Sequence, residues 1–160
     1  MPSAHFLQCC GSQTRSTESR MISPEDLYIL DVTQFTKDLY RLGNATWPVF
    51  TENRARLDVQ IAVQNGVEVV IANGNGFSAF DKIIPAMQMP GRKVWRIMKG
   101  AFLPQELVLV KDRRLNHPGH YLIAPAKTMP LKKYLGALEE LGMDRRRVQL
   151  LIQGANPNAR

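Results

Sequence analysis

Residues 120–129 read His-Tyr-Leu-Ile-Ala-Pro-Ala-Lys-Thr-Met, and the interpretation of the chain begins from this stretch. Its first six residues, His120 to Pro125, are mostly apolar and have the length of a β-strand. An earlier run from Glu106 to Lys111 is similar, and the polar link between the two runs contains Asn116 and Pro118-Gly119. Because turn-forming residues separate two apolar runs, the sequence predicts an antiparallel hairpin.

The chain after this hairpin has the pattern of helices. Thr128-Met129-Pro130 is a helix-start signal, and Leu131, Leu135, Leu138 and Leu141 recur at the spacing of one helical face before Gly142. A further short helix is expected from Asp144, as its capping residue, through Gln153.

The chain before the hairpin alternates between strand and helix patterns. Strands are expected at Thr36 to Leu42, Val67 to Ile71 and Lys93 to Met98, and a loop at Asn73 to Gly76. Helices are expected to begin at Ser23-Pro24-Glu25-Asp26 and to cover Thr51 to Gln64, and a helical turn is expected within Phe77 to Ile84, after Ser78. Strands without regular βαβ alternation favour the α+β class.

The domain limits follow from where this periodicity begins and ends. Residues 1–22 lack apolar periodicity and are expected to form a disordered tail, residues 23–155 a single domain, and residues 156–160 a short C-terminal tail. Cys9 and Cys10 are adjacent and have no histidines at zinc-ligand spacing, so reduced thiols are expected, and no metal site.

Charge is distributed unevenly along the chain. Residues 61–160 carry 15 of the 21 basic residues and 7 of the 14 acidic ones, a net charge of +8, whereas the whole chain carries +7. A basic C-terminal part suggests an anionic partner: a nucleic acid, a phosphate-bearing cofactor or an acidic protein. The sequence contains no apolar run long enough to span a membrane and no pattern of a signal peptide. We therefore expect a cytoplasmic protein, or one delivered to a target-cell cytoplasm by another route.

Three motifs together resemble a known family. They are Asp38-Leu39-Tyr40-Arg41, then Gly76-Phe77-Ser78-Ala79-Phe80-Asp81, and then residues 120–129. Their order and spacing are similar to those of the small ADP-ribosyltransferase toxins of the type VI secretion effector (Tse-type) family, which has relatives outside bacteria. The third motif is the most specific of them, and the resemblance covers roughly residues 37–153.

The resemblance implies an ADP-ribosyltransferase-like split antiparallel β-sandwich with peripheral helices and with NAD in a cleft. The glycosidic bond to nicotinamide would break, and ADP-ribose would pass to an acceptor that the sequence does not identify. A toxin of this kind also implies an immunity protein as a partner. The better-known ADP-ribosyltransferases carry a glutamate in the third motif, where this chain has His120, and no role is assigned to the nearest acids, Glu106, Asp112, Glu139 and Glu140.

The resemblance also implies roles for individual residues. His120 and Ser78 are the expected catalytic residues: the histidine would act on the ribose as the nicotinamide bond lengthens, and the serine would keep the site's strands and the ribose in register. The expected cofactor-binding residues are Arg41, whose forked guanidinium matches phosphate oxygens, and Tyr40, Phe80 and Tyr121, whose rings offer nicotinamide a flat apolar surface.

Two other interpretations remain open on the residues alone. A non-enzymatic nucleic-acid-binding module would use the basic C-terminal part, including Arg113-Arg114 and Arg145 to Arg147. An NAD-dependent RNA phosphotransferase would rely on arginine and histidine without the glutamate. Taken singly, Arg41 fits a solvated strand end, and Phe80 and Tyr121 fit ordinary core positions.

Overall fold

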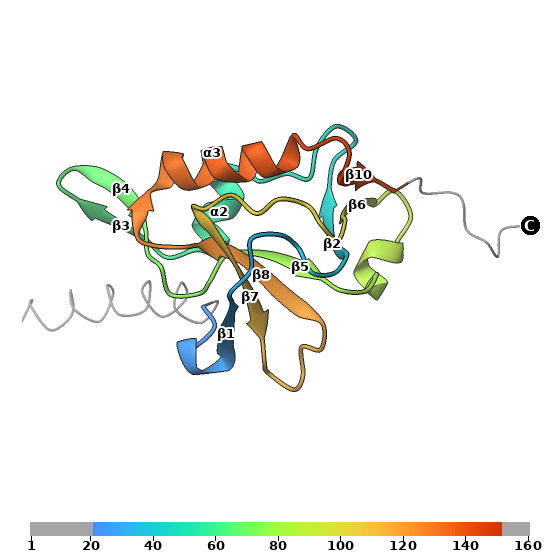
Figure 1. Ribbon diagram of the computed structural model, residues 1–160, viewed down its shortest axis with the longest axis horizontal. Helices are drawn as coiled ribbons and strands as arrows, with labels where there is room; N and C mark the ends of the chain where they lie inside the picture. The colour runs from blue at the N-terminus through green and yellow to red at the C-terminus, as the bar shows by residue number, and fades with distance from the viewer. Residues whose placement is uncertain (1–20, 152–160) are drawn as a thin grey trace, which may run out of the picture.

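The computed structural model describes residues 21–151, and this part of the chain has α+β architecture: two antiparallel sheets with helices packed on them (Figure 1). The helical elements are the 3₁₀ turns η1 (Pro24–Asp26) and η2 (Pro85–Gln88) and the α-helices α2 (Glu52–Asp58) and α3 (Leu131–Gly142). The strands are β1 (Leu27–Leu30), β2 (Leu39–Gly43), β3 (Ile61–Gln64), β4 (Val67–Val70), β5 (Phe77–Phe80), β6 (Lys93–Ile97), β7 (Leu107–Asp112), β8 (His120–Pro125), β9 (Met129–Pro130) and β10 (Val148–Leu150).

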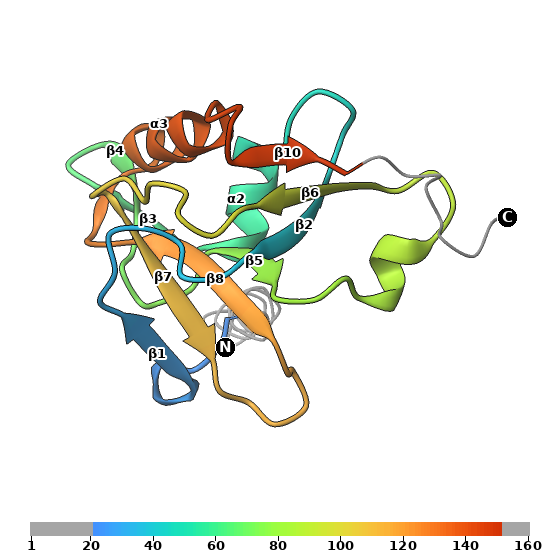
Figure 2. The same cartoon turned by 45° about the vertical axis from the view of Figure 1, so that its right-hand side comes forward.

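The larger sheet has seven strands in the order β1-β7-β8-β5-β2-β6-β10, and the smaller has three in the order β3-β4-β9. Figure 2 shows β10, β6 and β2 together in one half of the large sheet, and β1, β7 and β8 in the other. The two halves join at β2 and β5, which pair at one register position, Tyr40 opposite Phe80. The large sheet is therefore held together at its centre by very little strand pairing.

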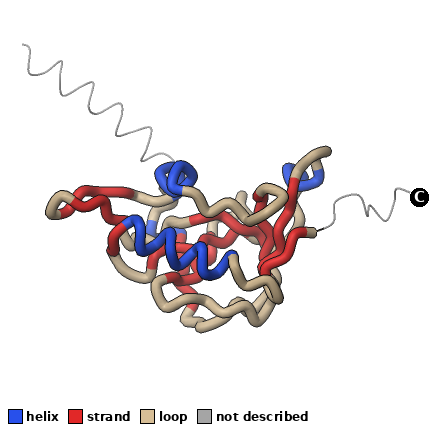
Figure 3. Tube along the Cα trace, turned by 90° about the horizontal axis from the view of Figure 1, so that it is seen from above, coloured by secondary structure: helices blue, strands red, loops and turns tan. Residues whose placement is uncertain are grey.

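The main core lies between the large sheet and α3, which crosses the strands in the view from above (Figure 3). Tyr134 of α3 is fully buried, stacks on Phe77 of β5 and donates a 2.6 Å hydrogen bond to the carbonyl oxygen of Ile123 in β8. Because side chains alternate along a strand, Ser78 and Phe80 point to the opposite face from Phe77. That opposite face carries a smaller apolar cluster of Ile22, Leu27, Val110, Leu122 and Ala124.

Several sequence predictions are confirmed. Strands β7 and β8 form the predicted antiparallel hairpin, and α3 ends at Gly142 as its apolar stripe indicates. Strand β4 begins at Val67 and β6 at Lys93, as predicted, while β2 begins at Leu39, three residues later than predicted.

The helix predicted from Thr51 to Gln64 is wrong in its second half. Thr51 does cap α2, since its hydroxyl accepts a hydrogen bond from the backbone N–H of Arg54, but the helix ends at Asp58. Residues Ile61–Gln64 form β3, which pairs with β4 across Asn65-Gly66. Both turn residues have positive φ, 50° and 75°, as the tight type I′ turn of a hairpin requires.

Three other predictions of helix are also wrong. The start signal at Ser23 produces only the 3₁₀ turn η1, because Leu27–Leu30 pairs with β7. No helical turn follows Ser78, since Phe77–Phe80 is strand β5 and the next helical turn, η2, begins at Pro85. Asp144 precedes a turn and the edge strand β10 instead of a helix through Gln153, because Val148–Leu150 pairs with β6.

Cys9, Cys10 and the expected C-terminal tail lie outside the described residues, and only residues 21 and 22 of the expected N-terminal tail lie within them. Ile22 is buried and its backbone is held from both sides by one side chain. The Ile22 N–H donates to Oδ1 of Asn75 at 2.8 Å, and Nδ2 of Asn75 donates to the Ile22 carbonyl oxygen at 3.0 Å. The loop of Asn75 therefore fixes the start of the described chain against the face that carries Ser78.

Gly76 gives a test of how tightly this loop packs on β8. A methyl group at Gly76 would collide with the carbonyl group of Ile123, which is backbone and cannot rotate away. We expect Gly76→Ala to lower the free energy of unfolding by about 1–3 kcal/mol, measured by urea denaturation. Gly136→Ala is the matched control: the added methyl meets open space on α3 and should stabilise the helix by about 0.5–1 kcal/mol. Equal stability of Gly76→Ala and the wild type would contradict this packing.

Candidate active site

Three polar side chains from three neighbouring strands meet on the face of the large sheet opposite α3. His120 begins β8 and lies opposite Phe80 of β5, so it is on the same face as Ser78, two residues before Phe80. Continuing the β7–β8 register places Asp112, the last residue of β7, opposite His120. The pleat and the register thus bring Asp112, His120 and Ser78 into one row.

The three side chains are connected by two short hydrogen bonds. The distance from Nδ1 of His120 to Oδ2 of Asp112 is 2.7 Å, and that from Nε2 of His120 to Oγ of Ser78 is 2.9 Å. A carboxylate can only accept, so Nδ1 carries the imidazole proton when His120 is neutral. Nε2 is then the acceptor for the Ser78 hydroxyl, and His120 is poised to take that proton.

The side chain of Asp112 has no exposed surface and is kept ionised by its neighbours. Burial opposes its ionisation, but hydrogen bonds from the Arg114 guanidinium, from His120 and from the Arg114 backbone outweigh burial and hold the pKa of Asp112 well below its usual range. Nη2 of Arg114 lies 2.7 Å from Oδ2 of Asp112. Asp112 is therefore a fixed negative charge behind the histidine.

His120 is neutral under ordinary conditions. Its pKa lies below the usual 6.5, first because burial disfavours the imidazolium, and also because His117 and Arg114 add positive charge nearby. Asp112 opposes this lowering without reversing it. Phe80 stacks on the imidazole with ring centroids 5.0 Å apart, which limits rotation of the ring. The histidine is therefore an oriented and neutral base.

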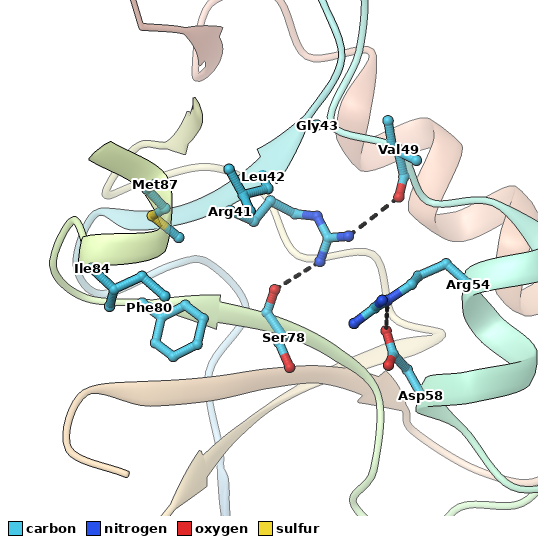
Figure 4. Close-up of a pocket in the computed structure, with 10 residues that line it drawn as sticks. All are labelled: Arg41, Leu42, Gly43, Val49, Arg54, Asp58, Ser78, Phe80, Ile84 and Met87. Atoms are coloured by element: carbon cyan, nitrogen blue, oxygen red, sulfur yellow. Dashed lines mark hydrogen bonds and ion pairs between the residues drawn. The ribbon is translucent and has the colours of Figure 1, made fainter. Parts of the chain in front are cut away.

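Arg41 occupies the place where β2 diverges from β5. Its guanidinium donates to three backbone carbonyl oxygens: Nη1 to Ser78 at 2.7 Å, Nε to Pro48 at 2.9 Å and Nη2 to Val49 at 3.2 Å. Figure 4 shows the bonds to Ser78 and Val49. Burial lowers the pKa of Arg41 to about 10, so the group still carries its charge at neutral pH. Arg41 thus braces the backbone of Ser78 from the side opposite His120.

Val49 supports this arrangement at a cost in backbone strain. Its φ is 58°, a value that β-branched residues rarely adopt because the side chain crowds the backbone. In this conformation its carbonyl oxygen faces the Arg41 guanidinium, as the dashed line in Figure 4 marks. Strain of this kind gathers at functional sites, where surrounding contacts hold it in place.

Ser78 lines two cavities. The larger has a volume of about 320 Å³, and its lining includes Arg41, Val49, Arg54, Asp58, Ser78 and Phe80. The smaller has about 210 Å³, and its lining includes Asp58, Asn75, Ser78, Arg114 and His120. Ser78 and Asp58 line both, so a bound molecule in either cavity would lie against a hydroxyl and a carboxylate.

Asp58 and Arg54 enter the larger cavity from helix α2 (Figure 4). They form an ion pair one helical turn apart, with Nε of Arg54 at 2.9 Å from Oδ2 of Asp58. The Asp58 side chain is largely covered, whereas the side chain of Arg54 is 52% exposed. The cavity therefore presents an accessible cation beside a shielded carboxylate.

The residues expected from sequence are only partly brought together. Ser78 and His120 touch each other, and Phe80 both stacks on His120 and lines the larger cavity. Tyr40 lies opposite Phe80 but is not among the residues that line the two cavities. Tyr121 is buried in the main core on the other face of β8, where its ring is beneath the ammonium of Lys37 at 5.4 Å.

Four polar residues of the site were given no role in it by sequence reasoning: Arg54, Asp58, Asp112 and Arg114. A signal for Asp112 was present, because extending the predicted hairpin by one residue places it opposite His120. Asp58 and Arg54 carried no comparable signal, since an Arg and an Asp four residues apart on a helix are ordinarily a solvated surface pair.

The part of the chain that the structure describes contains no group of three or more metal-binding side chains. Among the described helices, none has the length and apolar character needed to cross a bilayer.

Arg41 is expected to be important for folding because its donors face carbonyl groups. Arg41→Ala leaves the carbonyl oxygens of Pro48, Val49 and Ser78 without their donor, and hydrogen bonds to charged groups contribute about 1.5–3 kcal/mol each. We expect unfolding in urea to show a loss of about 3 kcal/mol or more, with Arg41→Lys recovering only part of it because an ammonium does not reproduce the fork. Arg92→Ala, on the exposed turn before β6, is the control and should retain wild-type stability. An Arg41→Ala protein as stable as this control would contradict the bracing role.

Comparison with known proteins places this chain within a family. The family model described as Tse2 ADP-ribosyltransferase toxin matches residues 37–149, well over half of the chain. Comparisons with curated proteins and with solved structures give no match. The matched range runs from just before β2 to β10 and so includes Arg41, Ser78, Asp112 and His120. On that match, the chain belongs to the Tse2 ADP-ribosyltransferase toxin family.

Proposed function

We propose that this protein is an NAD-dependent ADP-ribosyltransferase toxin that breaks the bond between nicotinamide and ribose and passes ADP-ribose to an acceptor. The observation that carries the proposal is the position of Ser78. Its hydroxyl is 2.9 Å from Nε2 of His120, and the residue lines both cavities together with Asp58. Arg54 lines the larger cavity and Arg114 the smaller. Membership of the toxin family supports the same reaction.

The proposal extends to the fold, as an ADP-ribosyltransferase-like split β-sandwich. Its support is the near-separation of the large sheet at β2 and β5, with a cavity where the strands diverge. In such an arrangement the ligand binds between the two halves, against residues from both.

The cavity offers complementary groups to each part of NAD. The exposed guanidinium of Arg54 suits the diphosphate, because arginine pairs with phosphate oxygens through two parallel hydrogen bonds. The Phe80 ring offers the nicotinamide a flat apolar surface, with Ile84 and Met87 beside it (Figure 4). Arg41 adds positive charge to the wall while its hydrogen bonds hold the wall in place.

Asp58 is the carboxylate best placed to act on the ribose. As nicotinamide leaves, positive charge develops on the sugar, and a shielded carboxylate stabilises such charge strongly. Asp58 lines both cavities, whereas Glu106 and Glu139 are not among the residues lining either. We therefore assign to Asp58 the electrostatic role that a third-motif glutamate has in better-known ADP-ribosyltransferases.

The experiment for this function is incubation of the purified protein with total cell lysate and NAD labelled in its adenylate part. Nicotinamide release is followed, and label is sought in protein, RNA, DNA and small molecules. We expect release that depends on the protein and on Asp58, with Asp144→Asn as the matched control on the turn after α3. Label in one fraction identifies the acceptor class.

Other outcomes would contradict the proposal in informative ways. Nicotinamide release only when phosphorylated RNA is present would identify an RNA phosphotransferase. Failure to bind or cleave NAD, together with RNA binding that weakens steeply with salt, would identify a basic nucleic-acid-binding module.

The biological context belongs to the same proposal. A toxin that consumes NAD acts in the cytoplasm of the cell that receives it, and the cell that makes it needs an immunity protein. A partner that covers the two cavities would block Ser78, Arg54 and Arg114 together.

The rate of nicotinamide release should depend on pH through His120. The groups that face its imidazole are Asp112, Ser78, His117 and Arg114. Because the pKa of His120 is below 6.5 and the neutral form accepts the serine proton, the rate should stay level above about pH 6.5 and fall in acid. The pKa of Asp112 is lower still, so its carboxylate persists across this range. A rate that rises as the pH falls would mean that the imidazolium is the active form.

A further inference from the structure

Ser78, His120 and Asp112 have the arrangement of an activated nucleophile. An oxygen nucleophile needs a base within about 2.6–3.2 Å and a third group that orients the base. The Ser78–His120 distance of 2.9 Å and the His120–Asp112 distance of 2.7 Å meet both requirements. We propose that Ser78 attacks the nicotinamide ribose of NAD and carries ADP-ribose as a covalent intermediate, with His120 as its general base and Asp112 as the positioning residue.

Contacts around the three groups restrict them to this geometry. Arg114 holds the Asp112 carboxylate through both of its oxygens, at 3.0 Å to Oδ1 and 2.7 Å to Oδ2. Phe80 covers one face of the imidazole. On the other side, Nη1 of Arg41 holds the Ser78 carbonyl oxygen at 2.7 Å, which fixes the backbone that carries the hydroxyl. A serine that served only to join strands would not require an oriented base with a buried carboxylate behind it.

The first step balances without any further reactant. The Ser78 oxygen forms a bond to C1′ of the nicotinamide ribose, the C1′–nitrogen bond breaks, and its electron pair leaves with nicotinamide, which becomes neutral. The hydroxyl proton passes to Nε2 of His120. Asp112 stabilises the resulting imidazolium, as the third member of a Ser-His-Asp set does elsewhere.

The second step releases the enzyme. An acceptor hydroxyl attacks C1′ from the opposite face, the bond from C1′ to the Ser78 oxygen breaks, and that oxygen takes back the proton from His120. The proton of the acceptor leaves to water or to the carboxylate of Asp58, which also lines both cavities. Because each displacement inverts C1′, two in succession retain the β configuration that NAD has at that carbon.

This inference rests on the proposed function, because NAD is the donor. It also depends on access to Ser78, which lines both cavities.

The test uses the full chain with NAD and methanol as a simple acceptor. Nicotinamide release and the configuration of the methyl ADP-riboside at C1′ are measured in the same reaction, the latter by proton NMR. We expect release and a retained, β-configured product. Release with an inverted, α-configured product would overturn the covalent intermediate and leave the proposed function standing. Absence of nicotinamide release would overturn both.

A trapping experiment examines the intermediate itself. Ser78→Cys puts a nucleophilic sulfur in the position of the serine oxygen. The thioglycosidic bond that it forms is cleaved more slowly, so the ADP-ribosyl adduct should accumulate. Peptide mapping after acid quenching should locate one ADP-ribosyl group on residue 78, distinct from Cys9 and Cys10. Ser78→Ala should carry no adduct on this peptide, whereas Ser23→Ala, which removes a surface hydroxyl that bonds Glu25, should behave as the wild type. NAD cleavage by Ser78→Cys without an adduct would overturn the proposal.

Discussion

Replacing His120 with alanine is expected to lower the rate of nicotinamide release by on the order of 10²-fold or more, while the affinity for NAD changes only a few-fold. The reason is that His120 contacts Ser78 and Asp112 and takes the serine proton only as the reaction proceeds. An interaction made mainly in the transition state affects turnover more than binding. Steady-state kinetics with calorimetric titration of NAD separate the two effects.

The control for this variant is His117→Ala in the β7–β8 connection. The ring centroid of His117 lies 6.2 Å from that of His120. Within the described residues, the His117 side chain has no hydrogen bond to Ser78, His120 or Asp112. It should retain most of the wild-type rate. Full activity of His120→Ala, with loss of activity in Glu106→Gln or Glu139→Gln instead, would contradict the site described above.

Asp112→Asn is expected to reduce the rate of nicotinamide release by on the order of 10³-fold. This lies between the effect of losing a general acid–base group, from about 10²-fold, and that of losing the aspartate of a Ser-His-Asp set, about 10⁴-fold. An amide can donate to Nδ1, which would place the imidazole proton on Nε2 and leave the Ser78 hydroxyl without an acceptor. The remaining activity should also show its acid limb at lower pH, because the carboxylate no longer raises the pKa of His120.

A purely structural role for Asp112 would give a different result. It would lower thermal stability and the amount of active protein, but the pH profile of the surviving fraction would be unchanged. Arg114→Lys is a milder variant for comparison, because it keeps a positive charge near Asp112 but loses the contact with both carboxylate oxygens. Asp144→Asn should match the wild type in both rate and pH profile.

The sequence predicted the parts of the fold whose patterns are local and strong. The β7–β8 hairpin and α3 each combine apolar periodicity with recognisable turn or capping residues, and both were predicted correctly. The membership of the toxin family was also recognised, because the order and spacing of three motifs are similar to those of the family. These motifs lie on β2, β5 and β8, which are neighbours in the large sheet.

The errors arose where pairing with a distant strand decided the outcome. Leu57 and Ile61 are four residues apart, which fits a helix, but Ile61 pairs with Val70 in the β3–β4 hairpin. Likewise Val148 pairs with Ile97, 51 residues earlier in the chain, so the region after Asp144 becomes an edge strand. Local propensity is a weak guide when a sheet edge is available.

The candidate site could be predicted only in part for a related reason. Ser78 and His120 were identified from the resemblance, and the structure brings their side chains to 2.9 Å. Tyr121 was expected to offer nicotinamide a flat apolar surface, yet it is on the opposite face of β8 from His120, because successive residues of a strand face opposite sides, and its ring is buried in the core. Arg41 was expected to be open to phosphate, but its fork is directed at three carbonyl oxygens that no sequence pattern reveals.

The central claim is that NAD is cleaved at the site formed by Ser78, His120 and Asp112, and nicotinamide release by purified full-length protein tests it most directly. Wild type, Ser78→Ala and the surface control Ser23→Ala are compared at equal concentration, with NAD, lysate as a source of acceptors, and a lysate blank. We predict release by the wild type and by Ser23→Ala, and a rate lower by on the order of 10²-fold or more in Ser78→Ala. No release above the blank, or equal release by all three proteins, would contradict the claim.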